Sequence, residues 1–296
     1  MSPAAPVTLG RVSIRGHTHL AVLLDGSALP LSYMIPGIGD DMISLISNWE
    51  DLAPRIHTLA AEAKDPEPIR LSDLRRPIDR PGKILAIGLN YADHVAETGM
   101  PMPDRQLWFC KFPTAANDPY ADVQIPRAGH QVDYEVELVA VIGKAGRHIS
   151  PDEASQHVFG YCIGNDVSVR DWQLSSPQWV LGKSFDGHAP FGPFITLANP
   201  SLDPHDLTIR AWVNGQLRQH SNTRHLVFSL WEQIAHVSKA VTLEPGDLIF
   251  TGTPGGVGVA LQPPTFLKAG DRVRCEIEGL GHIENAFQPE GSEHGS

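Results

Sequence analysis

Short segments with the character of β-strands, separated by turns, follow one another through most of the chain. With 27 glycines and 25 prolines among 296 residues, turns are frequent and long helices have little room. The Asn214–Gly215 pair between two strand-like stretches predicts a tight hairpin. The pattern predicts an α+β fold that is mostly β, with a rolled sheet or distorted barrel and peripheral helices. The expected helices lie at about 91–98, 151–157 and 227–239.

The first part of the chain reads differently from the rest. Residues 8–32 contain three short strand segments with a hairpin signal at Asp25–Gly26, and apolar residues recur at helical spacing over about 41–64. The segment KDPEPIRLSDLRRPIDRPGK then has the composition of a linker. The expected organisation is a small N-terminal α/β domain at 1–70, a linker at 71–82, a catalytic domain at 83–290 and a disordered tail at 291–296.

Charge and cysteine content argue against several classes of protein. The net charge of −11 disfavours nucleic acid and anionic membranes as partners, because both attract a basic face. The three cysteines are far apart and have neither zinc nor redox spacing, which favours a reduced intracellular setting. No apolar run approaches the roughly 20 residues of a membrane span, and the N-terminus lacks the layout of a signal peptide. These features predict a cytoplasmic protein.

Three acidic residues, Glu135, Glu137 and Asp166, stand out within the strand segments. Alternation along VDYEVELVAVIG places Asp133, Glu135 and Glu137 on one face of a strand, with roughly 6–7 Å between neighbouring acids. An E-x-E pattern alone is more often a solvated sheet face. Asp166 on the next segment could complete a cluster whose like charges repel unless a cation lies between them. Oxygen ligands suit Mg²⁺ or Mn²⁺, with Ca²⁺ as a further option.

Polar residues in three other segments could act beside such an ion. His94 and Glu97 in GLNYADHVAE are three residues apart, which puts them on one helix face where the carboxylate can orient the imidazole as a general base. In SVRDWQ, Arg170 could hold a substrate carboxylate, or could equally pair with an acid, and Gln173 could hold a keto oxygen or a water. Lys183 could pair with an acid or neutralise an enolate.

Two loops complete the candidate site. DLIFTGTPGGVG ends a strand in a glycine-rich turn, and such turns let backbone N–H groups approach an anion. The turn lacks the order of a nucleotide-binding loop, so we interpret it, with Thr253, as a loop for a substrate carboxylate. Lys111 is interpreted as a further substrate contact, in a segment at 98–122 that we expect to cover the pocket. The aromatic residues of this segment suggest room for an apolar or cyclic part of the substrate: Trp108, Phe109, Phe112 and Tyr120.

Taken in order, six segments over about 80–287 resemble the fumarylacetoacetate hydrolase family. They are GLNYADHVAE, VDYEVELVAVIG, GYCIGNDVSVRDWQ, GKSFDGHAPFGP, PGDLIFTGTPGGVG and GDRVRCEIEGLGHIEN. The resemblance implies a mixed β-sandwich roll, the small N-terminal domain and a homodimer. It also implies metal ligands at Glu135, Glu137 and Asp166, catalytic groups at His94, Glu97 and Lys183, and substrate contacts at Arg170, Gln173 and Thr253. Ile87 stands about where the fumarylacetoacetate hydrolases proper have a further Asp ligand, so the chain is similar to the three-carboxylate, acylpyruvase-like branch.

That branch includes acylpyruvate hydrolases, oxaloacetate decarboxylases, dienedioate isomerase/decarboxylases and diketo-sugar-acid hydrolases. The resemblance therefore implies a metal-dependent enzyme that acts on a small keto or diketo acid through a metal-stabilised enolate. The His94–Glu97 pair favours hydrolysis of a C–C bond in a β-diketo acid such as an acylpyruvate or fumarylpyruvate, because water activation needs a base. The alternatives are a decarboxylase, isomerase or dehydratase of an α-keto acid (oxaloacetate, a hydroxy-dienedioate or a keto sugar acid) at the same site, and a non-catalytic protein that binds a small acid.

Overall fold

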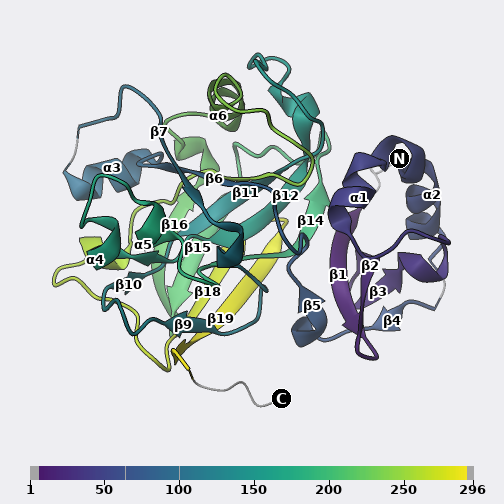
Figure 1. Ribbon diagram of the computed structural model, residues 1–296, viewed down its shortest axis with the longest axis horizontal. Coiled ribbons are helices and arrows are strands. Elements are labelled where there is room, and N and C mark those ends of the chain that lie inside the picture. The colour runs from purple at the N-terminus through teal and green to yellow at the C-terminus, as the bar shows by residue number, and fades with distance from the viewer. Residues whose placement is uncertain (1–6, 64, 100, 292–296) are drawn as a thin grey trace.

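Two β-sheets pack against each other in the larger part of the molecule, and a smaller N-terminal unit of strands and helices lies at one side (Figure 1). The computed structural model describes residues 7–63, 65–99 and 101–291. Among these residues the larger sheet has twelve strands, ten of which follow the order β4 (Glu67–Pro68), β3 (Ser27–Pro30), β2 (His17–Leu24), β1 (Thr8–Ile14), β14 (Ala189–Leu197), β12 (Val158–Asn165), β11 (Val136–Ile142), β17 (Leu248–Phe250), β6 (Ile84–Gly88) and β7 (Leu107–Lys111).

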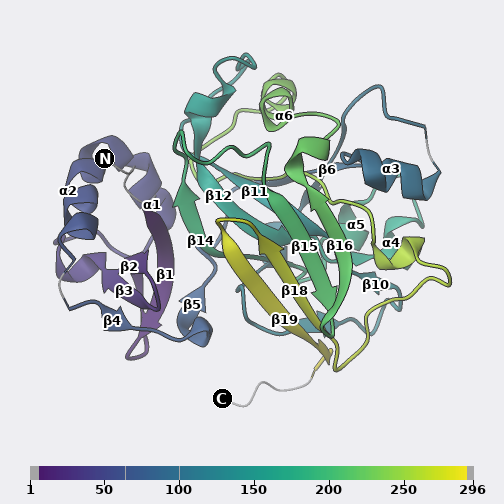
Figure 2. The same cartoon turned by 180° about the vertical axis from the view of Figure 1, so that it is seen from behind.

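The remaining strands form smaller groups. Two short strands of the larger sheet lie off its main path, β5 (Leu74–Arg75) beside β1 and β8 (Ala116–Asn117) beside β14. The second sheet, seen from behind in Figure 2, has the order β16 (Gln216–Asn222), β15 (Thr208–Val213), β18 (Arg272–Ile277), β19 (Gly281–Pro289) and β9 (Val123–Ile125). A separate pair consists of β10 (Val132–Asp133) and β13 (Ser168–Val169).

The helices are short and peripheral. In the described residues the α-helices are α1 (Met42–Ser47), α2 (Trp49–Ala61), α3 (Ala92–Thr98), α4 (Arg170–Gln173), α5 (Val180–Lys183) and α6 (Leu230–Val237). The 3₁₀ helices are η1 (Leu31–Tyr33), η2 (Leu71–Asp73), η3 (Pro113–Ala115), η4 (Ala154–His157), η5 (Thr223–His225) and η6 (Gly258–Ala260). The predicted fold class, α+β and mostly β with a sandwich of sheets and peripheral helices, is confirmed.

Strand β11 shows why the centre of the larger sheet is buried on both faces. Its side chains alternate between two cores: Val136 and Leu138 pack in the core shared with the second sheet, whereas Val139 and Val141 pack in a core shared with α1 and the first strands. All seven residues of the strand are buried. A sheet covered on both faces gives a nearly continuous apolar run, and the sequence VELVAVI has this form except at Glu137.

Local expectations from the sequence are met in the hairpins and differ in one helix. Asn214 and Gly215 both have positive φ, 52° and 77°, and join β15 to β16 in the predicted hairpin, as the right-handed twist of the strands favours. The helical pattern at 41–64 corresponds to α1 and α2, which meet at Asn48. The α-helix expected at 151–157 is instead a turn followed by the 3₁₀ helix η4.

The N-terminal unit continues the larger sheet. Strand β1 pairs with β14 through Thr8↔Thr196 and Leu9↔Ile195, so the first strands are hydrogen-bonded to the main body. The proline-rich linker segment also contributes a strand, since β5 pairs with β1. The domain boundaries stay a prediction, and residues 292–296 of the tail expected at 291–296 lie outside the described residues. Among the described residues, no helix has both the length and the hydropathy needed to cross a membrane.

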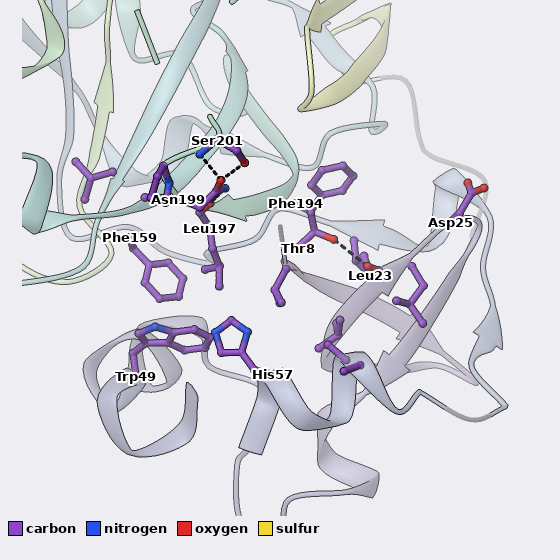
Figure 3. Close-up of a pocket in the computed structure, with 18 of the residues that line it drawn as sticks. Thr8, Leu23, Asp25, Trp49, His57, Phe159, Phe194, Leu197, Asn199 and Ser201 are labelled. Atoms are coloured by element: carbon purple, nitrogen blue, oxygen red, sulfur yellow. Dashed lines mark hydrogen bonds between the residues drawn. The ribbon is translucent and has the colours of Figure 1, made fainter. Parts of the chain in front are cut away.

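A groove of about 1390 Å³ opens between the N-terminal unit and the main body. Trp49 and His57 line it from the side of α2, facing Phe159 and Leu197 of the larger sheet (Figure 3). The Trp49 and Phe159 rings meet edge to face with their centroids 5.1 Å apart. None of the candidate site residues named above belongs to its lining, so the groove is separate from the acidic cluster.

The core between the two sheets gives a direct stability test. Replacement of the fully buried Leu138 by alanine should lower the free energy of unfolding by about 2–5 kcal/mol, because it removes apolar contacts and leaves a cavity. The matched control is Leu217→Ala, at a leucine that is 47% exposed, which should change stability by less than about 1 kcal/mol. Urea unfolding of both variants measures the difference, and similar losses would show that the core is placed wrongly.

Candidate metal centre

Three carboxylates converge where β11 and β12 lie side by side. Glu135 occupies the break between β10 and β11, Glu137 is on β11, and Asp166 directly follows β12. The register pairs Val136 with Asn165, and the Asp166 backbone N–H donates to the Glu135 carbonyl over 2.9 Å. One oxygen from each carboxylate lies within 4.8 Å of the others, and all three residues are buried. The sequence placed Asp133, Glu135 and Glu137 on one unbroken strand, whereas the structure has a break at Tyr134 and Glu135 between β10 and β11.

The chemistry of this donor set fits a divalent cation. Burial raises the pKa of Glu137 well above its usual range, and the negative charges of Asp166 and Glu135 raise it further. Burial would also raise the pKa of Glu135, but Lys183 and Arg170 lower it to about 2. A dication between the acids would offset the repulsion and allow Glu137 to ionise. Three carboxylates with only oxygen donors suit Mg²⁺ or Mn²⁺.

Ile87, on β6 and buried, contributes no ligand to this group. In the described residues the cluster contains the three acids that the three-carboxylate resemblance implied. A metal ion at this site would therefore be held by Glu135, Glu137 and Asp166, and their role as metal ligands stays a proposal.

Two buried lysines contact the cluster, and both donate to Asp166. Lys183, at the end of α5, donates from Nζ to Glu135 Oε2 over 2.8 Å and to Asp166 Oδ2 over 2.7 Å. Lys111, at the end of β7, donates to Asp166 Oδ1 over 2.6 Å and to the Val167 carbonyl over 3.1 Å. Burial is the largest influence on the Lys111 ammonium and lowers its pKa. Lys111 was expected as a substrate contact in a covering loop, and the structure instead places it on a strand, against a carboxylate.

Arg170 contacts two of the buried acids, Asp133 and Glu135. Its Nε and Nη2 atoms donate to Asp133 Oδ2 over 3.0 and 2.9 Å, and Nη2 also lies 2.7 Å from Glu135 Oε1. Its Nη1 donates to Gln173 Oε1 over 2.9 Å. Of the two readings given to Arg170, the structure shows the pairing with acids. The sequence predicted no role for Asp133. The available signal was its place on the same strand face as Glu135.

The glycine-rich turn contacts the cluster through Glu137. The Gly252 N–H donates to Glu137 Oε2 over 2.8 Å. The Thr253 hydroxyl donates to the Val136 carbonyl over 2.9 Å and accepts from the Gln219 side-chain amide over 2.8 Å. Thr253 was expected to bind a substrate carboxylate, but both directions of its hydroxyl are engaged within the protein. Gln219 had no distinguishing pattern in the sequence, because its importance depends on a contact with a loop 34 residues away.

His94 and Glu97 form the pair that their spacing predicted. Both are on α3, with His94 Nδ1 and Glu97 Oε1 2.8 Å apart. Glu97 Oε2 accepts from the Gly256 N–H over 2.7 Å, so the glycine-rich turn fixes this carboxylate too. Asp93 is held in the same way by the Gly255 N–H and by the Ser221 hydroxyl, at 3.3 and 2.6 Å. The imidazole is among the groups that lower the pKa of Glu135, which places it near the cluster.

The aromatic residues of the 98–122 segment are divided between two places. Trp108 and Phe109 belong to strand β7 rather than to a loop, and the Lys183 ammonium lies 4.8 Å from the centroid of the Phe109 ring. Tyr120 lies elsewhere, where its hydroxyl donates to the His282 carbonyl over 2.7 Å. The segment that was expected to cover the pocket therefore contains a strand, and its aromatic side chains do not gather in one place.

Comparison with known proteins places this arrangement among enzymes. Residues 83–288 match the family described as fumarylacetoacetate (FAA) hydrolase C-terminal. The chain is 42% identical over 262 residues to the mitochondrial oxaloacetate tautomerase FAHD2B of Bos taurus, covering 88% of this chain and 83% of that protein.

Two solved structures have the same fold. The fumarylacetoacetate hydrolase of the psychrophilic Exiguobacterium antarcticum is 33% identical with a TM-score of 0.80, covering 96% of this chain and 100% of that one. The maleylpyruvate hydrolase of Sphingobium sp. SYK-6, solved with manganese(II) and pyruvate, is 31% identical with a TM-score of 0.79, covering 95% of this chain and 99% of that one.

The predicted cytoplasmic location and homodimer stay predictions, and the name of the bovine relative places that protein in mitochondria.

The metal role of the acids gives a test that does not depend on catalysis. In Glu137→Gln a neutral amide replaces a carboxyl group whose pKa burial raises, so the metal-free protein should keep its stability. The affinity for Mn²⁺, measured by titration calorimetry, should fall by about 100-fold or more. The Mn²⁺-dependent rise in melting temperature should shrink with it.

The matched control is Asp104→Asn, because the Asp104 side chain is 82% exposed. It should bind Mn²⁺ as the wild type does. Equal Mn²⁺ affinity in Glu137→Gln and the wild type would remove Glu137 from the ligand set.

Proposed function

The chain belongs to the fumarylacetoacetate hydrolase family, and from this premise we propose that it is a tautomerase that interconverts the enol and keto forms of a small α-keto dicarboxylic acid such as oxaloacetate. This is an isomerase of the kind considered from the sequence as the alternative, and it takes the place of C–C hydrolysis as the main function. The name of the bovine relative supports the substrate class. The observation that carries the mechanism is a proton-transfer pair, His94 and Glu97, held near three convergent carboxylates.

The acids would hold the ion and the basic residues would balance their charge. A divalent cation held by Glu135, Glu137 and Asp166 would act as a Lewis acid on the negative charge that develops at the enolate oxygen. Lys183 bridges Glu135 and Asp166, and therefore would keep two of the proposed ligands in place. Lys111 does the same for Asp166. With the dication bound, their ammonium groups would leave a positive environment suited to an anionic substrate.

Tautomerisation needs one group that moves a proton to or from carbon. The enol-to-keto direction adds a proton to the substrate carbon and removes one from the enol oxygen. With Nδ1 of His94 facing Glu97, Nε2 is the ring atom left to carry that proton. Glu97 fixes the orientation of the ring, and the Gly256 N–H fixes Glu97 in turn.

Gln173 is the best candidate for a direct substrate contact on the side of α4. Its Oε1 accepts from Arg170, which leaves the NH₂ end of the amide for a substrate carboxylate. Arg170 itself is engaged by Asp133 and Glu135, so we assign it to bracing rather than to substrate binding. This differs from the role that the resemblance implied.

C–C hydrolysis is the second candidate function. It is favoured by the similarity to maleylpyruvate hydrolase and by the same His94–Glu97 pair, which could remove a proton from water. Hydrolysis and tautomerisation differ in whether water attacks a carbonyl, so substrate selection separates them.

The first activity test concerns His94. In His94→Asn the rate of enol-to-keto conversion of oxaloacetate, followed by ultraviolet absorbance with Mn²⁺ present, should fall by about 10²–10⁴-fold. Mn²⁺ affinity should be unchanged, because the acids remain. His236→Asn, at an exposed histidine on α6, is the control and should retain full activity. A His94→Asn rate within about twofold of the wild type would remove His94 as the proton carrier.

The second activity test is a substrate panel for the wild-type protein with Mg²⁺ or Mn²⁺. Tautomerisation and decarboxylation of oxaloacetate are measured beside hydrolysis of acylpyruvates and maleylpyruvate. We expect kcat/KM for oxaloacetate tautomerisation to exceed the other values by about tenfold or more. A larger value for a hydrolysis reaction would overturn the proposed function in favour of the hydrolase, and absence of turnover on the whole panel would favour a binding protein.

A further inference from the structure

A row of side chains on β7 runs from the acidic cluster to the surface. Side chains alternate between the two faces of a strand, so Leu107, Phe109 and Lys111 share one face of β7. Trp108 is on the other face and packs against the core between the sheets. Lys111 is buried against Asp166, Phe109 is half-buried and Leu107 is 40% exposed. An apolar surface therefore leads from solvent to the proposed metal site.

The indole of Trp179 lies against this row. Its centroid is 5.7 Å from that of the Phe109 ring, and the two ring planes meet at 59°. Trp179 directly precedes α5, the helix that ends in Lys183. The Lys183 ammonium lies 4.8 Å from the centroid of the Phe109 ring and donates to Glu135 and Asp166. The two aromatic rings are thus in continuous contact with the groups that surround the acids.

Gly88 lets the indole lie this close to the sheet. Gly88 is the last residue of β6 and pairs with Leu107 of β7. A Cβ at Gly88 would meet Cζ3 of Trp179 at 2.5 Å and Cδ2 of Leu107 at 3.5 Å. The first of these distances is far shorter than a carbon–carbon contact allows. Because Gly88 is not among the glycines with positive φ, its lack of a side chain serves the close approach of Trp179 rather than a turn.

The aromatic pair and the proposed proton carrier border the same end of the larger sheet. Strand β6 is parallel to β17, and β11 is antiparallel to β17. The end of β6 at Gly88, the turn at Gly252 and the start of β11 at Glu137 therefore lie at one end of these strands. The chain continues from β6 into α3, which carries His94. Figures 1 and 2 show α3 and α5 on the same side of the molecule, away from the N-terminal unit.

We propose that Trp179 and Phe109 form the wall of the substrate site that limits how far a ligand extends beyond its keto acid group. The inference rests on the proposed function in one respect, which is that the site binds an α-keto acid. The acids and lysines are suited to the oxygen atoms of such a ligand, whereas the rings offer only apolar contact to its chain. Packing of Trp179 against both Phe109 and Gly88 resists displacement of the indole. A short acid should therefore fit, and a longer chain should have to push the indole away.

The test measures the binding of straight-chain 2-oxo acids to the Mn²⁺-loaded protein by titration calorimetry. From pyruvate to 2-oxohexanoate, wild-type affinity should fall by about tenfold or more, because the longer chain overpacks the wall. In Trp179→Ala the order should reverse, since each added CH₂ that finds apolar contact raises affinity by about fourfold. Oxalate, which has no such chain, should bind to both proteins equally.

Trp212→Ala is the matched control, at a tryptophan of β15 that packs against Arg274 in the second sheet. It should keep the wild-type dependence on chain length. Trp179→Leu shortens the side chain and keeps it apolar, so it should reduce that dependence even if Trp179→Ala does not fold. Thermal unfolding shows whether each variant is folded.

Equal affinity of the wild type for pyruvate and 2-oxohexanoate would overturn the proposal, as would the same dependence on chain length in the wild type and in the folded Trp179 variants. A wild type that binds none of the acids would overturn it together with the proposed substrate class. Binding of the acids without turnover of oxaloacetate would contradict the proposed function alone, because the calorimetric measurement needs no reaction.

Discussion

Buried charge is the constraint on which the rest of this structure depends. Four acids, Asp133, Glu135, Glu137 and Asp166, lie in the interior with three bases, Lys111, Arg170 and Lys183. An unpaired buried charge is costly, and six of these seven groups lie within contact distance of an opposite charge. The strands and short helices around the cluster position the bases: β7 ends at Lys111, α4 begins at Arg170, and α5 ends at Lys183. The ion pairs leave one acid in excess, and Glu137 is the acid whose pKa shows the imbalance.

The sequence predicted those features that depend on short-range patterns. The mostly β fold, the hairpin at Asn214–Gly215 and the helical stretch at 41–64 follow from turn residues and apolar periodicity, and the structure has them, with the helical stretch divided into α1 and α2. The pairing of His94 with Glu97 is of the same kind, because three residues on a helix set the distance between the side chains. The helix expected at 151–157 failed because its polar residues support a turn and a single 3₁₀ helix as easily.

The sequence could not predict contacts that depend on how distant segments come together. Arg170 meets Asp133 across 37 positions, and Lys111 meets Asp166 across 55. Neither spacing carries a local signal. The same limit explains why Arg170 and Thr253 were expected to face a substrate: their residue types suit a carboxylate, but only the folded chain shows that protein groups already occupy them. The continuity of β1 with β14 is likewise a long-range pairing.

The turn from Gly252 to Gly256 has a further consequence. Its amides hold Glu137 at one end and Glu97 at the other, so a single short length of backbone sets the distance between the proposed metal ligands and helix α3. Inserting one residue into this segment would change the distance between Glu137 and Glu97 without replacing either of them. Replacement of side chains elsewhere would leave this distance unchanged. A chain that keeps the length of the turn would therefore keep the geometry of the proposed site even where its other residues differ.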